Sequence, residues 1–379
     1  MTLARLDCIP TLAHGNEKQI VIIVIKNSFY NHFLVQCLRT MSSFQTIPLF
    51  FLANLFIFIS ALVLSIAIGS TDIPLLTTLH ILMAKILPLS PPPLAQEIVI
   101  WSIRVPRVLV AAAVGAGLAV AGVQMQGLFH NPLASPEIIG TSAGGVLGAV
   151  LALALGLTHY SIFYLPMFAF LGAFSALLLI YGIAYHHFQH LTTLLLAGVA
   201  LNALLGAITS YLISISWTDY EVAREILFWL MGSLENRLWL HVIIVLPIVL
   251  TGIIIALFYS RELDILLLGN DTAQTLGIEV TRVKSHLLAN IALLTGAAVA
   301  VSGMIGFIGL IIPHIARLFV GPAHRFLIPA SALSGATFLL LVDLLARTLH
   351  RPQEIRLGIL TAFIGAPFFL YLLLKQRYE

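Results

Sequence analysis

The chain has 379 residues, of which 60% are hydrophobic and 9% are charged, and its mean hydropathy is +1.03. A soluble protein of this length does not have such a composition, so the sequence predicts an all-α membrane protein. The net charge of +3 is too small and too scattered for a nucleic-acid surface. Both cysteines, Cys8 and Cys37, precede Met41, which excludes a disulfide framework or a thiolate metal site from the hydrophobic body.

The first 45 residues are expected to form an N-terminal extension outside the fold. The apolar run from Gln19 to Ile25 is too short to span a bilayer, and Lys26 and Asn27 interrupt any longer version. No small-residue cleavage site follows this run, which argues against a cleavable signal peptide. Our hypothesis is that translation starts at Met41, and tryptic peptides from residues 1–39 of the mature protein would refute it.

Charge-poor windows of about 20 residues mark helices that can cross the bilayer, because each residue adds about 1.5 Å to a helix. From Ile138 to Thr218 there is no Asp, Glu, Lys or Arg, which leaves room for three such helices. Over 46–379 we predict one transmembrane domain of about ten helices, with both of its ends on one side of the membrane. The predicted spans are 49–68, 107–127, 138–157, 163–183, 194–214, 240–259, 286–303, 304–320, 326–345 and 355–374.

Two segments rich in small residues resemble each other. Residues 115–122 read GAGLAVAG and residues 296–303 read GAAVAVSG, and each is followed by Gly, Phe and Pro at similar intervals. With ten spans the two segments run in opposite directions, which is the inverted repeat that transporters use. The alternative is that membrane helices rich in Gly and Ala resemble one another by composition alone.

Two proline-containing segments interrupt the apolar pattern. Residues 129–137 join two charge-free spans, and their prolines forbid a continuous helix. This segment either narrows a central pathway, with Asn131 and Leu133 pointing inward, or is a turn stiffened by proline. Pro313 kinks another apolar segment, and the neighbouring His314 is more typical of a packing partner than of a metal ligand.

The polar loop 261–285, on the side of the chain ends, predicts two short helices. Asn270 or Asp271 is a suitable N-cap for the second helix, and Gly269 and Gly277 close the two stretches. Such a pair of helices either docks a soluble partner or rests on lipid.

Arginines are expected near the opposite membrane face, at Arg104, Arg107, Arg347 and Arg351. Their guanidinium groups suit carboxylates of a protein or ligand, or alternatively phosphate headgroups. Positive residues are divided almost equally between the two faces, so charge does not determine the orientation.

Six segments together resemble the FecCD/BtuC family of ABC-importer permeases over about residues 50–375. The resemblance implies a BtuC-like type II importer, in which two permease subunits of ten helices each form a central pathway for a metal chelate. In chain order the segments are RVPR (104–107), GLFHNPLA (127–134), LLLAGVAL (194–201), LLLGNDTAQTLG (266–277), GFIGLIIPHIAR (306–317) and TAFIGAPFF (361–369).

The resemblance also implies roles for three sets of residues. The loop 261–285 corresponds to the family's coupling helices, which sit in a cleft of a cytoplasmic ATPase. The set for binding-protein docking is Arg104, Arg107 and Arg347, which match periplasmic arginines that pair with glutamates of the substrate-binding protein. The set for the cytoplasmic gate is Asn131, Leu133, Leu191 and Thr192. The set for ATPase coupling is Leu266, Leu268, Gly269, Ala273, Leu276 and Gly277.

The sequence departs from the family at two places. The gate segment near Leu191 is less polar than in other members, and Glu354-Ile355-Arg356 stands where most members have Glu-Leu-Pro. The second departure adds a charge at the outer end of the last span, close to the expected docking surface.

The chain is expected to be a transport subunit and not an enzyme. It has no Gly-x-x-x-x-Gly-Lys-Ser/Thr motif, so ATP must be bound by another polypeptide, and we expect no cofactor or metal on this chain. The expected partners are a second permease subunit as a homodimer, two ABC ATPase subunits, a periplasmic substrate-binding protein and the lipid of a bacterial cytoplasmic (inner) membrane.

The expected substrate is an iron chelate, either a siderophore or haem, and the alternatives within the same fold are cobalamin and molybdate. An ion-coupled secondary transporter is the rival class. It needs carboxylates near the middle of the membrane, and only Asp343 lies inside a predicted span. The predicted spans contain neither a carboxylate pair nor an activated nucleophile, so the sequence does not favour a membrane enzyme.

Overall fold

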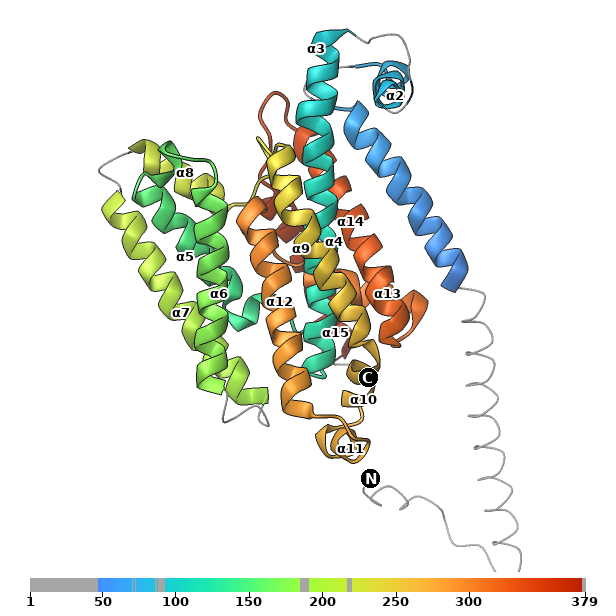
Figure 1. Ribbon diagram of the computed structural model, residues 1–379, viewed down its shortest axis with the longest axis vertical. Helices are drawn as coiled ribbons and strands as arrows, with labels where there is room; N and C mark the ends of the chain where they lie inside the picture. Colours follow the sequence, from blue (N-terminus) through green and yellow to red (C-terminus); the bar gives the residue numbers. More distant parts are fainter. Residues whose placement is uncertain are drawn as a thin grey trace, which may run out of the picture. The chain divides into compact units, whose positions relative to one another are not determined.

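In the computed structural model the described residues run from 47 to 376, except positions 70, 72, 86, 88–92, 185–190 and 217–219. The extension expected over residues 1–45, and the hypothesis about its translation, fall outside these residues. Every regular element in the described part of the chain is a helix (Figure 1). From Phe50 onward the chain forms one compact unit. The predicted all-α fold is confirmed.

Each of the ten predicted spans corresponds to a helix. Within the described residues, seven helical segments are long and apolar enough to cross a membrane, while α5, α13 and the part Leu357–Leu372 of α15 are shorter apolar stretches. The ten helices are Ile47–Ala67, α4 (Val105–Leu128), α5 (Thr141–Ala154), α6 (Tyr164–Ala184), α7 (Leu191–Ser216), α9 (Trp239–Phe258), α12 (Val280–Ser302), α13 (Ile308–Val320), α14 (His324–Thr348) and α15 (Leu357–Gln376).

Shorter elements join these helices. The span predicted over 107–127 is the inner part of a longer helix, because α3, η1 and α4 run on as one helix from Leu94 to Leu128. Figure 1 shows α2, α3 and α8 at one end of this unit and α10 and α11 at the other. The short elements are α2 (Leu75–Ala84), α3 (Leu94–Glu97), η1 (Ile98–Arg104), η2 (Pro136–Ile139), η3 (Leu157–His159), α8 (Tyr220–Leu230), α10 (Ser260–Leu266) and α11 (Asn270–Thr275).

Helix α4 is the centre of the packing. Nearly all of its residues are buried, and it contacts α9, α12, α13 and α14. A Cβ atom on Gly115 would lie 2.2 Å from the carbonyl oxygen of Gly335, and one on Gly122 would lie 1.9 Å from that of Gly309. Only residues without a side chain allow these backbones to approach so closely, which is how small residues drive helix association in lipid.

The two segments of the sequence repeat lie on neighbouring helices of opposite direction. Helix α4 starts at the α8 end and α12 starts at the α10 end, and the two helices pack against each other (Figure 1). Each is followed by a break, at residues 129–140 and 303–307, and then by one of the shorter helices, α5 or α13. This arrangement agrees with the predicted inverted repeat.

A buried polar contact joins three of the central helices. The Asn290 side chain on α12 donates to Gln124 Oε1 on α4 at 3.1 Å and to the carbonyl oxygen of Gly252 on α9 at 2.9 Å. Lipid offers no alternative partner for these groups, so the contact holds the three helices in one register.

Candidate functional site

The predicted arginines lie together at the α8 end. Arg104 is only 4% exposed, and its guanidinium points at the C-terminal end of the first helix, Ile47–Ala67. It donates to the carbonyl oxygen of Ile66 at 3.0 Å and to Thr71 Oγ1 at 2.9 Å, and it also donates to the carbonyl oxygens of Ala67 and Thr71. The last carbonyls of a helix have no partner within it, and Arg104 supplies one.

Arg107 and Arg347 share one buried carboxylate. Asp343 is fully buried, accepts from Arg107 Nη2 at 2.8 Å and forms an ion pair with Arg347 Nε at 3.0 Å. Arg107 also holds Glu354 in a fork, with distances of 2.9 and 2.7 Å to its two carboxylate oxygens. Arg347 further donates to the carbonyl oxygens of Ser65 and Ile68. All three guanidinium groups thus bind groups of the same chain, including the carboxylates of Asp343 and Glu354.

A charged cavity of about 400 Å³ lies beside this cluster, at α8. Arg356 pairs with Glu235 at 2.9 Å, and burial lowers the pKa of Arg237 to about 10. Helix α8 contains none of the site residues predicted from the sequence. The lining includes Glu221, Arg224, Glu225, Glu235, Arg237 and Arg356.

At the opposite end of the bundle, α4 ends in a turn that positions Asn131 and Leu133, the first two predicted gate residues. His130 has a φ of 50°, and the N–H groups of His130 and Asn131 donate to the carbonyl oxygens of Gly127 and Gln126. This pattern is a Schellman motif with His130 in the left-handed position. Asn131 Oδ1 then accepts from the Leu133 N–H at 2.9 Å, so the two residues form one local turn.

The other two predicted gate residues, Leu191 and Thr192, form the start of α7, where a loop was expected. Their side chains are outside the described part of the structure. Farther along α7, Asn202 Nδ2 donates to the carbonyl oxygens of Glu137 at 3.0 Å and Ile138 at 3.2 Å, which fixes α7 to η2.

The predicted pair of short helices is confirmed as α10 and α11. Helix α11 begins at Asn270, so Gly269 occupies the N-cap position that was expected for Asn270 or Asp271. Gly269 and Gly277 have φ values of 104° and 84°, which favour glycine. Leu266 and Ala273 are buried against the bundle, whereas Leu268 is 64% exposed and Leu276 is 59% exposed. The six predicted coupling residues therefore divide into anchors, turns and an exposed apolar surface.

The break after α4 and helix α10 meet at one cavity of about 480 Å³. Asn131 lines it from the break, Leu267 from the end of α10, and His314 and Arg317 from α13. His130 also hydrogen-bonds the backbone of Leu266. The structure thus places the break that carries Asn131 beside the end of α10, which no local sequence signal could show.

Helix α10 is fixed to the bundle by a second polar contact. Asp264 Oδ1 accepts from the His324 backbone N–H at 3.0 Å and contacts His324 Nδ1 at 2.6 Å. Burial alone would raise the pKa of Asp264, but the hydrogen bonds from the side chain and backbone of His324 lower it. Helix α10 is therefore joined to the start of α14 as well as to the break after α4.

Two charged residues have positions that the sequence did not reveal. Lys284 on α12 is 1% exposed, and its Nζ atom has no hydrogen-bond partner among the described residues. Glu137 lies in the break after α4. Its carboxylate faces Gly306, since a Cβ atom added to that glycine would lie 3.3 Å from Glu137 Oε1. Its neighbour Pro136 approaches Gly309, which packs beside the middle of α4. Glu137 thus lies against the second break, the one that precedes α13.

Comparisons with known proteins agree with this geometry. The sequence profile described as the FecCD transport family matches residues 56–375. The cobalamin import system permease protein BtuC of Halobacterium salinarum is 45% identical over 282 residues, which are 74% of this chain and 74% of that protein. The hemin transport system permease protein HmuU of Yersinia pestis is 44% identical over 282 residues, which are 73% of this chain and 84% of that protein.

A solved structure has the same fold. It is an inward-facing conformation of a metal-chelate type ABC transporter, with 36% identity and a TM-score of 0.75, and the match covers 86% of this chain and 99% of that one. The resemblance drawn from six motifs is confirmed, as is the expected position as a multi-pass protein of the inner membrane. The chain belongs to the FecCD transport family and is a permease of an ABC importer.

Proposed function

We propose that this permease carries an iron chelate, a siderophore or haem, from the periplasm to the cytoplasm, powered by a separate ATPase. The observation that carries the proposal is the 44% identity to a hemin permease, together with a fold like that of a metal-chelate transporter. Cobalamin is the second candidate, because a cobalamin permease is similar to the same degree. Haem and cobalamin are both metal chelates of a large ring, so one wide pathway suits either.

In this proposal α10 and α11 are the coupling helices, and the end that carries them faces the cytoplasm. Leu268 and Leu276 supply an exposed apolar surface for a cleft of the ATPase, with Gly269 and Gly277 forming the turns beside it. Leu266 and Ala273 anchor the pair to the bundle. Closure of two ATPase subunits then moves α10 and α11 as rigid bodies.

The proposed cytoplasmic gate consists of Asn131 and Leu133 in the break after α4, with Leu191 and Thr192 at the start of α7. The contact of His130 with the backbone of Leu266 supports a direct mechanical connection from the coupling helices to this gate. Two permease copies, as a homodimer, would place two such gates around one pathway.

We propose the α8 end as the periplasmic docking surface for a substrate-binding protein. Glutamates of that protein would pair with Arg104, Arg107 and Arg347, and at Arg107 and Arg347 they would compete with the chain's own carboxylates. Glu354 is the easier one to displace, since its side chain is 25% exposed whereas that of Asp343 is fully buried. The charged cavity beside α8 would add complementary contacts at the edge of this surface.

The test uses the purified permease–ATPase complex in proteoliposomes with its binding protein. Leu276→Arg is expected to abolish uptake while ATP hydrolysis continues, because a charge replaces an apolar contact in the cleft; Leu276→Met is the matched control. Normal uptake by Leu276→Arg would overturn the coupling assignment. Uptake of radioactive iron as siderophore or haem, in competition with cobalamin, tests the substrate, and exclusive cobalamin uptake would overturn the iron proposal.

A further inference from the structure

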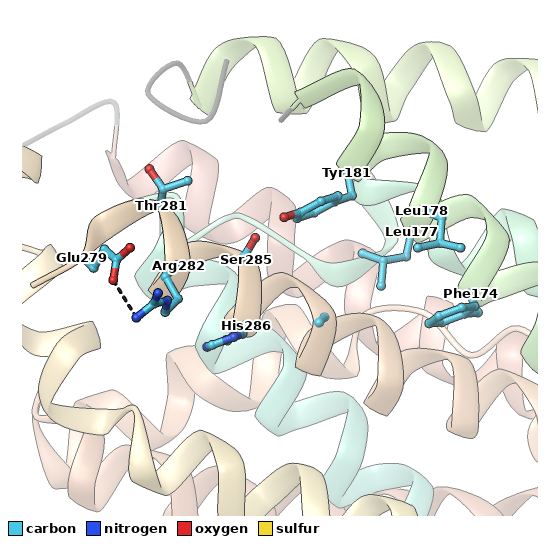
Figure 2. Close-up of a pocket in the computed structure, with 10 residues that line it drawn as sticks. Phe174, Leu177, Leu178, Tyr181, Glu279, Thr281, Arg282, Ser285 and His286 are labelled. Atoms are coloured by element: carbon cyan, nitrogen blue, oxygen red, sulfur yellow. Dashed lines mark ion pairs between the residues drawn. The ribbon is translucent and has the colours of Figure 1, made fainter. Parts of the chain in front are cut away.

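A groove runs along α12 near the α10 end, on the side facing α6. It consists of two adjoining cavities of about 450 and 630 Å³, which share Phe174 and Leu177 on α6 and His286 and Ala289 on α12. Figure 2 shows the α6 residues facing the first turns of α12 across this space. Because four residues line both cavities, the two form one continuous groove.

The groove changes from polar to apolar along its length. Its mouth contains Glu279, Arg282 and Ser285, whereas its far part is lined mostly by apolar side chains such as Phe170 and Leu293, with Tyr259 and Asn290 also on its wall. From Glu279 to Ala292 the helix rises about 20 Å, which exceeds half of the roughly 30 Å hydrocarbon core of a bilayer. A polar mouth with an apolar channel of this length matches a lipid headgroup and its acyl chain.

The mouth holds one positive and one negative group. Arg282 Nη1 lies 2.7 Å from Glu279 Oε2, and both side chains are about two-thirds exposed, at 67% and 64%. The Ser285 Oγ atom is buried and has no hydrogen-bond partner among the described residues. Such an exposed pair is weakly held, and Arg282 keeps further N–H donors for a phosphate.

We propose that this groove binds one zwitterionic phospholipid with a primary amine in its headgroup, such as phosphatidylethanolamine. Arg282 and Ser285 donate to the phosphate oxygens, Glu279 accepts from the ammonium group, and one acyl chain lies between α6 and α12. The balanced charge at the mouth favours this headgroup over an anionic one, because Glu279 repels a lipid whose only charge is the phosphate. The proposal rests on the membrane location of the chain and not on its cargo or its coupling helices.

The experiment is native mass spectrometry of the intact permease–ATPase complex, purified in mild detergent and exposed to equal amounts of phosphatidylethanolamine and phosphatidylglycerol. The wild-type complex is expected to retain one phosphatidylethanolamine per permease, at least fivefold over phosphatidylglycerol. Glu279→Gln is expected to shift retention toward phosphatidylglycerol. Arg282→Gln is expected to lower retention of both lipids about fivefold, since one basic residue at a membrane surface contributes roughly that factor.

A groove-filling variant provides the geometric test. Ala289→Trp places a large ring where both cavities meet and is expected to abolish retention of either lipid, whereas Ala53→Trp, on the exposed face of the first helix, is expected to match the wild type. The proposal fails if the wild type retains neither lipid, or if Ala289→Trp retains as much as Ala53→Trp. It also fails if Glu279→Gln leaves the headgroup preference unchanged, or if Ala289→Trp instead changes the number of permease copies, which would assign the groove to a subunit interface.

Discussion

His130, in the turn that ends α4, hydrogen-bonds the backbone of Leu266, at the end of α10. This one contact joins the predicted gate to the predicted coupling helices, and Leu267 and Asn131 line the same cavity beside it. A displacement of α10 by an ATPase would therefore reach the break after α4 directly, without passing through the length of a helix.

Removal of this contact is expected to weaken coupling. His130→Ala removes the side-chain donor, so uptake should fall several-fold while the rate of ATP hydrolysis by the complex changes little. His130→Gln keeps a donor of similar reach and should retain more of the uptake. Both rates are measured in proteoliposomes, and equal uptake by His130→Ala and the wild type would show that the contact transmits nothing.

The same residue predicts a pH dependence. Burial, with a contribution from the charge of Lys284, lowers the pKa of His130 below 6.5. The unfolded chain therefore takes up a proton at a higher pH than the folded chain does. The contribution of His130 to stability is complete above pH 6.5 and is lost as the pH falls through the lower folded value.

The corresponding measurement is the thermal unfolding temperature of the purified protein between pH 7.5 and pH 5.5. The fall in this temperature should be smaller for His130→Gln than for the wild type, because glutamine does not titrate. Identical falls for the two proteins would contradict the assignment.

The arginine cluster predicts unequal roles for its two carboxylates. Asp343→Asn leaves buried Arg107 and Arg347 without their shared counter-charge and should cost about 3–5 kcal/mol of stability. Glu354→Gln removes a partly exposed partner and should cost about 1 kcal/mol or less. Thermal unfolding of the two variants in detergent tests the difference, and similar losses would show that Asp343 is not the central partner.

The crossing of α4 and α13 predicts a packing effect at Gly122. A methyl group there would lie 1.9 Å from the carbonyl oxygen of Gly309, so Gly122→Ala forces the two backbones apart. We expect a loss of about 1–3 kcal/mol, typical of overpacking. Gly206→Ala on α7 is the control, since a Cβ there meets nothing within 4 Å. An unchanged unfolding temperature in Gly122→Ala would contradict the close approach.

The buried ammonium group of Lys284 is expected to lower the free energy of unfolding. Its ammonium nitrogen is buried without a hydrogen-bond partner among the described residues, and burial of a polar group without a partner is unfavourable by about 1–3 kcal/mol. Lys284→Met should therefore raise the unfolding temperature, whereas Lys85→Met, which removes a partly exposed charge paired with Glu97, should change it little. A lower unfolding temperature for Lys284→Met would reveal a stabilising role for its charge.

Much of the fold was predictable from the sequence because the bilayer imposes a simple local requirement. Each span must be apolar and must satisfy its own backbone, so charge-poor windows located all ten helices, and Gly269 and Gly277 marked the turns of α10 and α11. The shorter lengths of α5 and α13 were not predictable, because the preceding breaks are fixed by packing of η2 and Gly309 against α4.

The sequence by itself determined the membrane class, the positions of the ten apolar helices and, through six ordered motifs, the family. Only the tertiary structure decided which polar groups are partners. Arg107 and Asp343 lie 236 residues apart in the sequence, and His130, in the turn after α4, contacts Leu266 at the end of α10. Such pairings depend on how helices cross and not on local periodicity. The sequence therefore predicted these arginines as a docking surface, whereas in the structure they bind Asp343, Glu354 and the end of the first helix.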